Sequence, residues 1–291
     1  MKFLKNINYN NIDKGIEYLK TNKFNYYLPE GEKTIYHVYW YGTLGRKQIC
    51  CINSYLKTQD LETTKLWVWL DYKTYKLSKN KVPKHDNIVV KKYIPNEEAR
   101  GTLFEKYPYL NQKKYLKFRS DIARIIFLYK YGGLYYDLDM ILLKDLKPLL
   151  NLEFCYTWSN LKKGNNGILR LKKQSELANQ LMNKYITTIS PFNLNNQPFF
   201  LGYNQYIFTK EIDIMCFPSV MFDPVWILTD TKTKSKYSNL SHFDNFFKTT
   251  DEDINTFFDN PLFPYHWHSR NNYKIEKNSY FEKLESLNLL V

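Results

Sequence analysis

The chain has 291 residues, of which 44% are hydrophobic, 18% aromatic and 24% charged. This composition excludes a disordered or a fibrous protein, and a chain of this length buries roughly three-quarters of its unfolded surface without disulfides or a structural metal. The 42 basic and 29 acidic side chains leave a net charge of +13, which favours an anionic partner: nucleic acid, a phosphorylated substrate or an acidic membrane surface.

The cysteine and hydropathy patterns indicate where the protein works. Its cysteines, Cys50, Cys51, Cys155 and Cys216, form no Cys-x-x-Cys pair, which favours buried thiols in a reducing compartment. No apolar run reaches the roughly 18 residues of a membrane span, and the first residues lack the apolar run of a signal peptide. We therefore expect a soluble cytoplasmic protein, with peripheral binding to an acidic membrane surface as a further option.

The first third of the chain predicts an extension followed by strands. Residues 1–32 are polar and predict an N-terminal extension. Residues 34–40 are rich in β-branched and aromatic residues and predict a strand, and the apolar run 66–70 is typical of a buried strand. The lysine-rich stretch 72–92 predicts a solvated loop that contains a small strand at 88–90.

The clearest helix extends over about residues 111–131. One of its faces is apolar, at the spacing i, i+4, i+7, i+8 and i+11: Phe118, Ile122, Ile125, Ile126 and Tyr129. Gly132-Gly133 ends it where a helix favours a left-handed residue. Residues 134–139 then predict a strand, and residues 141–143 a second, shorter one.

The second half continues the alternation of strands and helices. Strands are predicted at 154–158, 167–171 and 212–217, and a helix at 175–186. The sequence from Ser279 to Glu282 has capping-box spacing and opens a last helix. This alternation predicts an α/β fold with a partly parallel sheet, and no Gly-, Ser- or Pro-rich linker divides it.

Asp137 and Asp139 are the first candidate site residues. On a strand, their spacing of two places both carboxylates on the same side. Two such carboxylates repel each other unless a cation lies between them, and oxygen ligands suit Mg²⁺ or Mn²⁺. A metal of this kind commonly neutralises a diphosphate. Two solvated aspartates at a strand end remain the simpler interpretation of the pair alone.

Asp121 and Arg124 lie three residues apart on the predicted helix, beside its apolar face. Taken alone, they predict an ordinary intrahelical ion pair. They gain weight because a Ser-Asp-x-x-Arg helix, a Gly-Gly stop and a Tyr-x-Asp-x-Asp strand follow one another between Ser120 and Asp139.

This block resembles the sugar-binding DxD region of glycosyltransferases. Its relatives include mannosyltransferases, α-1,4-glycosyltransferases of the globoside-synthase type and bacterial capsule enzymes, and glycosylating clostridial toxins share the core pattern. The resemblance implies a GT-A fold, a single Rossmann-like nucleotide-sugar-binding domain with a mixed central sheet, over residues 33–291. Its donor-binding part would extend over about 33–145 and its acceptor-side part over about 146–291.

The resemblance also implies roles for single residues. Asp139 would bind the metal directly, and Asp137 would contact the ribose and the metal. Asp121 and Arg124 would hold hydroxyls of the donor sugar, with Arg124 also steadying the diphosphate. Tyr135 would lie beside the donor.

Segments outside the block extend the resemblance. Residues 35–40 match a strand near the family's start, where Trp40 would stack on the nucleotide base. A core tryptophan is the less favoured alternative. Residues 217–226 resemble a late Phe-Pro to Pro-x-x-Trp stretch. Residues 265–269 match a terminal histidine motif, in which His266 is preferred to His268 as the third metal ligand.

The chain departs from the family pattern at two places. Residues 270–272 are Arg-Asn-Asn where the family continues into Gly-Ser-Trp, which leaves the third metal ligand open. The region 201–203 lacks the family's Gly-Pro, so the acceptor side is expected to be unusual. Asn165 or Asn166 would contact the sugar or serve only the loop.

The function implied by the resemblance is a metal-dependent, retaining glycosyltransferase. It would use Mn²⁺ or Mg²⁺ and a nucleotide-diphosphate sugar, UDP-linked by family habit. The acceptor would be a glycan, a lipid-linked sugar or a protein.

Three other functions fit parts of the sequence. A phosphotransferase of the haloacid-dehalogenase type would use Asp137 as its nucleophile, but it normally continues into Gly-Thr, and Met140-Ile141 follows here. A glycoside hydrolase needs two carboxyl groups across a bond rather than a metal-binding pair. A basic nucleic-acid-binding module would use the lysine-rich stretches 72–92 and 162–173, but no recognised binding motif accompanies them, and nucleic acid is not an expected partner.

Overall fold

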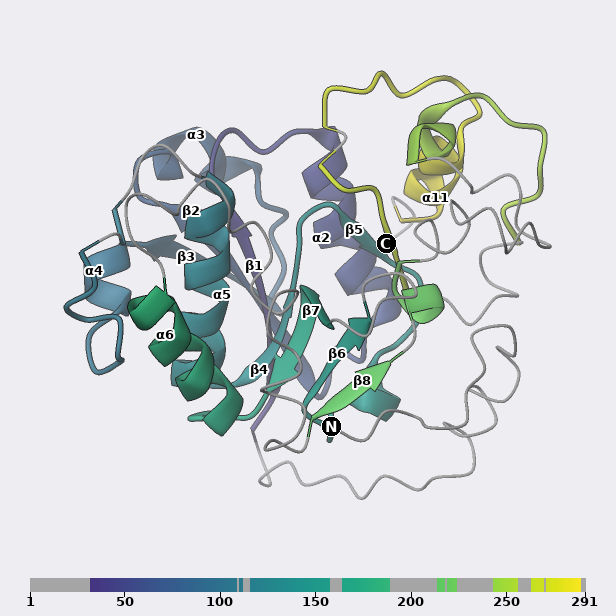
Figure 1. Cartoon of the computed structure of the whole chain (residues 1–291). Coiled ribbons are helices and arrows are strands. Elements are labelled where there is room, and N and C mark those ends of the chain that lie inside the picture. The colour runs from purple at the N-terminus through teal and green to yellow at the C-terminus, as the bar shows by residue number, and fades with distance from the viewer. Residues whose placement is uncertain are drawn as a thin grey trace.

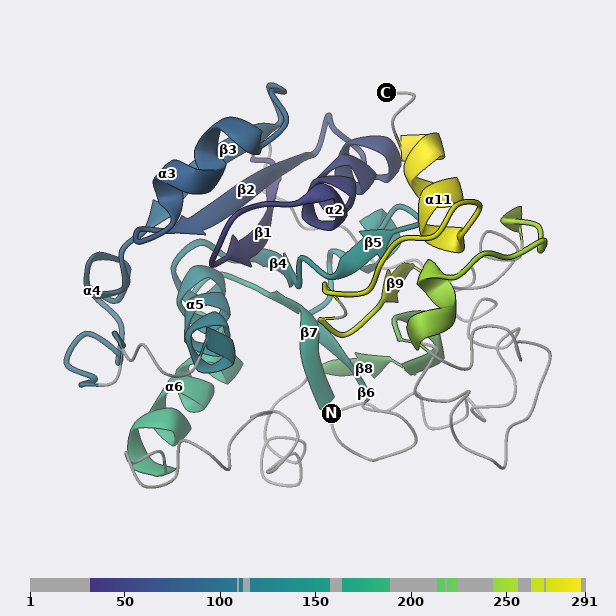
Figure 2. The ribbon, with the colours of Figure 1, turned by 90° about the horizontal axis from the view of Figure 1, so that it is seen from above.

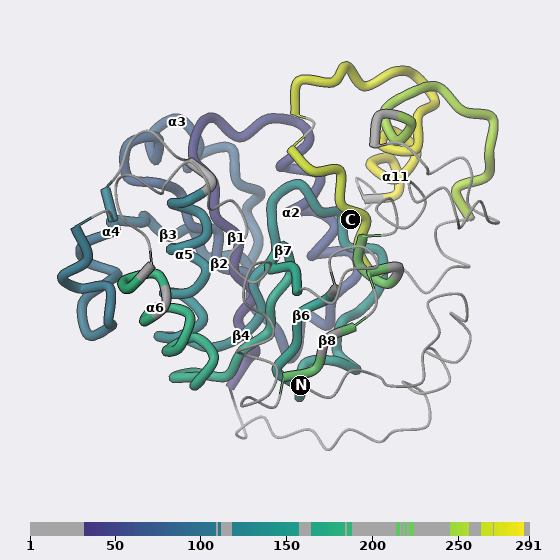
Figure 3. Tube along the Cα trace, in the orientation of Figure 1, coloured from purple at the N-terminus to yellow at the C-terminus, as the bar shows by residue number. Residues whose placement is uncertain are grey.

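The computed structural model describes residues 32–108, 110–111, 116–157, 164–188, 214–217, 219–223, 243–255, 263–269 and 271–288, which are coloured in Figure 3. The expected N-terminal extension up to residue 31 and the acceptor-side segment 201–203 lie outside these residues. None of the helices in the described parts of the chain combines the length and the apolar character that a membrane span requires.

In the described part of the chain, a mixed sheet of seven strands forms the centre (Figure 1). Its strands follow one another in the order β3-β2-β1-β4-β7-β6-β8. The four strands from β3 to β4 are parallel, β7 is antiparallel to β4 and β6, and β8 is parallel to β6. Their bounds are β1 Thr34–Trp40, β2 Thr64–Asp71, β3 Ile88–Tyr93, β4 Gly133–Tyr136, β6 Phe154–Thr157, β7 Gly164–Leu171 and β8 Met215–Phe217. The predicted α/β class with a mixed GT-A-type sheet is confirmed. The expected donor-binding part, up to about residue 145, and the expected acceptor-side part after it both contribute strands to this sheet.

Helices cover both faces of the sheet (Figure 2). Helix α2 (Arg46–Thr58) and the last helix, α11 (Tyr280–Asn288), pack against each other on one face, and α5 (Leu116–Tyr131) with α6 (Glu176–Thr188) lies on the other. Successive residues of β1 serve the two cores in turn: Tyr36 and Val38 on the α2 side, and Tyr39 on the α5 side. Short helices α3 (Tyr75–Ser78) and α4 (Pro95–Glu98) precede and follow β3.

Among the described helices and strands, α2 is the long element that the sequence analysis missed. Its buried positions include Lys47, Gln48 and Ser54 beside apolar ones, so its hydrophobic pattern is blurred. Tertiary partners bind these polar groups: the Ser54 hydroxyl accepts a hydrogen bond from the backbone of Leu142 at 2.9 Å, and the Gln48 amide donates to Asn271 at 2.9 Å. The helix therefore depends on neighbours that its own sequence does not reveal.

The Gly-Gly stop after α5 works as predicted. Gly132 and Gly133 have φ angles of +66° and +100°, which favour glycine. A Cβ atom on Gly133 would lie 2.0 Å from the carbonyl oxygen of Ile35 on the neighbouring strand β1. The absence of a side chain therefore lets β4 approach β1.

The predicted strand over residues 134–139 is too long. Strand β4 ends at Tyr136, and a turn closed by the backbone bond from Met140 to Asp137 at 3.0 Å follows. Asp137 and Asp139 therefore lie in a turn and do not share a side of a strand. The loop predicted over 72–92 is also wrong in part, because it contains α3 and a 3₁₀ helix at Lys79–Lys81. The small strand predicted at 88–90 is confirmed as β3, which continues to Tyr93.

A second, two-stranded sheet joins the middle of the chain to its end. Strand β5 (Met140–Leu142) pairs antiparallel with β9 (Pro264–His266), which the sequence analysis did not predict. In this register Met140 lies opposite His266. The pairing therefore places the C-terminal histidine motif next to Asp139.

Candidate functional site

The candidate site lies at the carboxyl ends of β1 and β4. Strand β1 lies between β2 and β4 and is parallel to both. Strands β2 and β3 follow one another on one side of β1, and the chain then returns to add β4 on the other side. Such a reversal of strand order opens a crevice at the carboxyl edge of an α/β sheet, where ligands bind. Trp40 is the last residue of β1, and Asp137 directly follows β4.

Two side chains bind the carboxylate of Asp137: Arg124 from α5 and Tyr135 from β4. Its Oδ1 accepts hydrogen bonds from Arg124 Nη2 and from the Tyr135 hydroxyl, each at 3.1 Å. Its backbone N–H donates to the carbonyl of Gly167 at 2.9 Å, which ties the turn to β7. Burial raises the pKa of Asp137, and the nearby Arg124 cation only partly opposes this rise. The side chain keeps 24% of its exposure, so it is still accessible from outside.

Arg124 connects two carboxylates from different elements. Its Nη2 lies 3.2 Å from Asp121 Oδ1 on the same helix and 3.1 Å from Asp137 Oδ1 after β4. The guanidinium also lies over the Tyr135 ring, 4.6 Å from its centroid, and its Nη1 donates to the carbonyl of Asn166. Burial alone would lower the pKa of Arg124, but the two carboxylates outweigh it and raise the pKa, so the group stays charged.

Asp121 is positioned from β7 as well as from α5. The Asn166 side chain donates to Asp121 Oδ1 at 3.2 Å, while its backbone carbonyl accepts from Arg124. Asp121, Arg124 and Asn166 are all buried. The intrahelical ion pair expected from the sequence is present, and it is one side of a larger network that joins α5, β4 and β7.

Asp139 faces the C-terminal motif. Its Oδ1 lies 3.1 Å from His266 Nε2, and its Oδ2 accepts hydrogen bonds from the backbone and hydroxyl of Ser269. Burial opposes ionisation of Asp139, but His266 outweighs it and holds the pKa of the carboxyl well below its usual range. In the same way burial would lower the pKa of His266, and Asp139 raises it to about 10. Asp139 is buried, whereas the simpler interpretation of the sequence placed it in solvent at the end of a strand.

The two histidines have different neighbours. His266 contacts Asp139, whereas His268 Nε2 lies 2.7 Å from Asp223 Oδ2. Asp137, Asp139 and His266 each offer a ligand atom, and these atoms all lie within 4.8 Å of one another. The structure thus brings together the three residues that the sequence analysis assigned to a metal, and their role as ligands stays a prediction.

Trp40 has a more ordinary environment. It is half-buried, packs against the core on the α2 side, and donates from Nε1 to the carbonyl of Thr43 at 3.3 Å. On the opposite face of the strand end, the guanidinium of Arg119 lies 5.4 Å from the centre of the Tyr41 ring. Stacking of Trp40 on a nucleotide base stays a prediction.

Asp223 and Tyr156 are the site residues that the sequence analysis missed. The Asp223 side chain is fully buried, and its Oδ2 also lies 3.4 Å from His266 Nδ1. The Tyr156 hydroxyl donates to Asp223 Oδ2 at 3.3 Å and lies 3.4 Å from His266 Nδ1. Asp223 lies in the segment 217–226, which resembles the family in its aromatic and proline residues. Its carboxylate, between Phe222 and Pro224, was the one feature of the sequence that could have indicated a site residue here.

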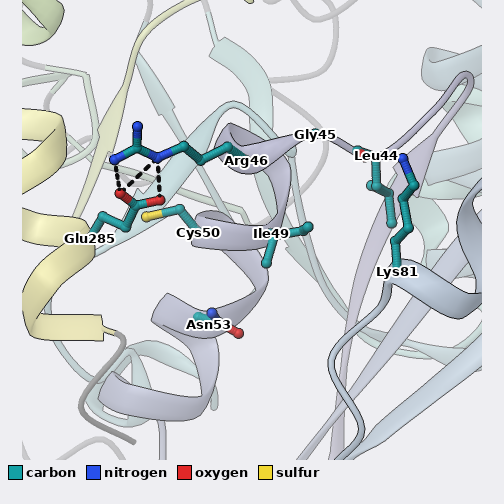
Figure 4. A pocket seen from close by; sticks show the side chains of 8 residues that line it. All are labelled: Leu44, Gly45, Arg46, Ile49, Cys50, Asn53, Lys81 and Glu285. Atoms are coloured by element: carbon teal, nitrogen blue, oxygen red, sulfur yellow. Dashed lines mark hydrogen bonds and ion pairs between the residues drawn. The ribbon is translucent and has the colours of Figure 1, made fainter. Parts of the chain in front are cut away.

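A cavity of about 470 Å³ opens beside the start of α2 and is separate from this cluster (Figure 4). Arg46 and Glu285 form a bidentate ion pair on one side of it, with 2.9 Å between Arg46 Nε and each carboxylate oxygen. The pair joins α2 to α11. The lining residues are Leu44, Gly45, Arg46, Ile49, Cys50, Asn53, Lys81 and Glu285.

A family model matches residues 46–155 of the chain and is described as "Glycosyltransferase sugar-binding region containing DXD motif". The match begins with α2 and includes Asp121, Arg124, Asp137 and Asp139. It ends before Asp223 and the histidine motif. Among curated protein sequences, none matches the chain.

Solved structures of glycosyltransferases resemble the chain at low identity. "WbbM bifunctional glycosytransferase apo structure" is 10% identical over 91% of this chain and 51% of that chain, with a TM-score of 0.51. The apo-form glycosyltransferase GlyE of Streptococcus pneumoniae TIGR4 is 13% identical over 88% and 60%, with a TM-score of 0.48, and "PaToxG Glycosyltransferase" is 17% identical over 61% and 70%, with a TM-score of 0.40. The chain spans about half the length of the WbbM structure, and that likeness shows a shared fold.

Proposed function

Because the chain carries a DXD-containing glycosyltransferase sugar-binding region on a GT-A fold, we propose that it is a metal-dependent, retaining glycosyltransferase. Its donor is a nucleotide-diphosphate sugar, UDP-linked in the first instance, and its acceptor is a glycan, a lipid-linked sugar or a protein. The net charge of +13 favours an acidic acceptor or an acidic membrane surface beside it.

The convergence of Asp137, Asp139 and His266 is the observation that carries the proposal. Their ligand atoms come from β4's end and from β9 and meet at the carboxyl edge of the sheet. The 3.1 Å between Asp139 Oδ1 and His266 Nε2 suits two neighbouring ligands of one ion at bond lengths of about 2.1–2.2 Å. The mixed oxygen and nitrogen set favours Mn²⁺ over Mg²⁺, which prefers oxygen alone.

Asp121 and Arg124 bind the donor sugar and its diphosphate. Arg124 stays cationic in a buried place, and Asp121, Asp137 and Asn166 hold its guanidinium in one orientation. A fixed cation of this kind stabilises negative charge without having to reorganise as the charge develops. A cation held by Asp137, Asp139 and His266 would further neutralise the leaving diphosphate.

The transfer step requires no protein side chain as a base. The bond between the anomeric carbon and the diphosphate oxygen breaks, the acceptor oxygen bonds to the same face of the sugar, and the acceptor proton passes to the departing diphosphate. Arg124 stabilises the diphosphate charge, while Asp121 holds the sugar hydroxyls in place.

Slow donor hydrolysis tests the proposal without an acceptor. The protein is incubated with Mn²⁺ and a panel of nucleotide sugars, and released nucleoside diphosphate is measured. We expect one donor to be hydrolysed, with the release lost in EDTA and in Asp139→Asn. The matched control is Asp86→Asn, the same change at an exposed residue in the turn before β3.

Donor binding decides the case in which no donor is hydrolysed. Calorimetry with the panel in Mn²⁺ then shows whether any nucleotide diphosphate binds. Absence of both hydrolysis and metal-dependent binding contradicts the proposal, as does full activity of Asp139→Asn.

A further inference from the structure

We propose that Asp223, His266 and His268 form a second divalent-cation site, of the zinc type, which competes for His266 with the ion at Asp137 and Asp139. Binding at this second site stands on the geometry of its own three residues. The competition rests on the proposed function.

The three donors have the spacing of a four-coordinate ion. Asp223 Oδ2 lies 2.7 Å from His268 Nε2 and 3.4 Å from His266 Nδ1, and the three ligand atoms all lie within 4.8 Å of one another. A tetrahedral ion with bonds of about 2.0–2.1 Å separates its ligands by roughly 3.3 Å. Small shifts of the side chains therefore suffice to receive the ion, with a fourth position left for water.

The Asp223 carboxylate is an independent sign of a missing ligand. It is fully buried, and its Oδ1 has no hydrogen-bond partner among the residues that the structure describes. A buried carboxylate oxygen without a partner is costly, and such groups are normally paired or bound to a metal. A cation between Asp223 and the two histidines would bind this carboxylate.

The backbone conformation of the histidine motif also directs both imidazole rings toward Asp223. His268 and Ser269 have φ angles of +50° and +57°, a left-handed conformation that is uncommon outside glycine. It turns the His268 ring over that of His266, with 3.7 Å between the ring centres and 27° between their planes. Both rings thus present a nitrogen to one carboxylate. Local strain of this kind is typical of functional sites.

The chemistry of the two donor sets differs. Two imidazole nitrogens and one carboxylate oxygen suit Zn²⁺, Co²⁺ or Ni²⁺, whereas the carboxylate-rich set at Asp137 and Asp139 suits Mn²⁺. The second set is therefore selective for ions to the right of Mn²⁺ in the first transition row.

His266 cannot serve both ions as a neutral ring, because one of its nitrogens carries the hydrogen. When an ion occupies the Asp223 site, Nδ1 is the ligand and Nε2–H donates to Asp139 Oδ1, 3.1 Å away. When an ion occupies the Asp139 site, Nε2 is the ligand and Nδ1–H points to Asp223 and Tyr156. Zinc at the second site therefore weakens Mn²⁺ binding at the first.

Metal titration of the full chain tests the second site directly. With Mn²⁺ absent, Co²⁺ is added and the visible absorption of four-coordinate Co²⁺ is followed; Zn²⁺ is then titrated by calorimetry. We expect one tight site per chain, at least tenfold weaker in His268→Gln and in Asp223→Asn but retained in Asp137→Asn. His85→Gln, at an exposed turn, is the matched control, and circular dichroism confirms that each variant is folded.

His268→Gln decides the matter if Asp223→Asn fails to fold, because His268 is partly exposed. Unchanged zinc affinity in His268→Gln contradicts the second site. Loss of the tight site in Asp137→Asn contradicts it too, since zinc would then bind at the carboxylate pair.

Electron paramagnetic resonance of Mn²⁺ tests the competition. We expect Zn²⁺ to release bound Mn²⁺ from the wild type at a concentration at least tenfold lower than from His268→Gln. Simultaneous tight binding of both ions contradicts the competition. If the wild type binds Zn²⁺ but no Mn²⁺, the proposed function fails while the second site stands.

Discussion

His266 Nε2 lies 3.1 Å from Asp139 Oδ1, although the two residues belong to distant parts of the chain. The pairing of β5 with β9 produces this contact, because it sets Met140, the neighbour of Asp139, opposite His266. The bond from Trp267 N–H to the carbonyl of Asp139 at 3.1 Å extends the same pairing. The backbone therefore fixes the distance between the carboxylate and the imidazole.

This contact predicts unequal effects of the two histidines on metal dependence. His266→Ala should raise the Mn²⁺ concentration needed for half-maximal donor hydrolysis by roughly tenfold or more, since it removes a proposed ligand. His268→Ala should leave that concentration unchanged or lower it, because His268 Nε2 lies 2.7 Å from Asp223, whereas His266 is the histidine 3.1 Å from Asp139. A larger effect of His268→Ala would overturn the assignment of His266.

Arg124→Lys should impair both folding and activity. The lysine ammonium cannot reproduce the fork that reaches Asp121, Asp137 and the carbonyl of Asn166. Breaking a buried network of this kind costs about 3 kcal/mol of the free energy of unfolding. Urea unfolding and donor hydrolysis measure the two effects. Arg100→Lys, at an exposed position, should change neither, and an unchanged Arg124→Lys protein would contradict the role of the fork.

Gly133→Ala should destabilise the sheet strongly. Its Cβ would lie 2.0 Å from a backbone oxygen of β1, and neither strand can move without breaking the β1–β4 pairing. Gly101 has a positive φ of +74° but nothing within 4 Å of its added Cβ. Gly101→Ala should therefore cost about 1 kcal/mol, the strain alone, and Gly133→Ala well over 3 kcal/mol. Thermal unfolding compares the two, and equal melting temperatures would contradict the explanation.

His37 should make the fold sensitive to acid. Burial lowers its pKa to about 3, although the bond to the carbonyl of Gly132 opposes the shift. Its other nitrogen accepts from Trp69 Nε1 at 3.1 Å, so the neutral ring is bound on both sides. The unfolded chain takes up a proton near pH 6.5, whereas the folded one does not until about pH 3, so acid favours unfolding between these values.

Urea unfolding at pH 7.5 and 5.5 measures this effect. The wild type should lose about 1.4 kcal/mol more of its free energy of unfolding on acidification than His37→Gln, which keeps a donor and an acceptor but cannot protonate. The control is His85→Gln, at an exposed position, which should lose as much free energy of unfolding on acidification as the wild type. Equal losses in wild type and His37→Gln would show that His37 protonates freely in the folded state.

Features that depend on neighbours along the chain could be predicted from the amino-acid sequence. The spacing of Phe118, Ile122 and Ile126 marked the buried face of α5, and the glycines after it marked the stop. The strands around them followed from short apolar runs. Asp121, Arg124, Asp137 and Asp139 fall in one short segment, so the order and spacing of these residues sufficed to match their pattern to a family.

Features that join distant segments depend on the tertiary fold. Helix α2 buries polar side chains whose partners lie near residues 142 and 271, so its pattern looks mixed until those partners are known. The β9 strand is three residues long, and its partner in the described part of the chain is β5. Asp223 joins the candidate site because the fold places it against His266 and His268. Contacts of this kind depend on the closure of long loops, and no periodicity within one segment encodes them.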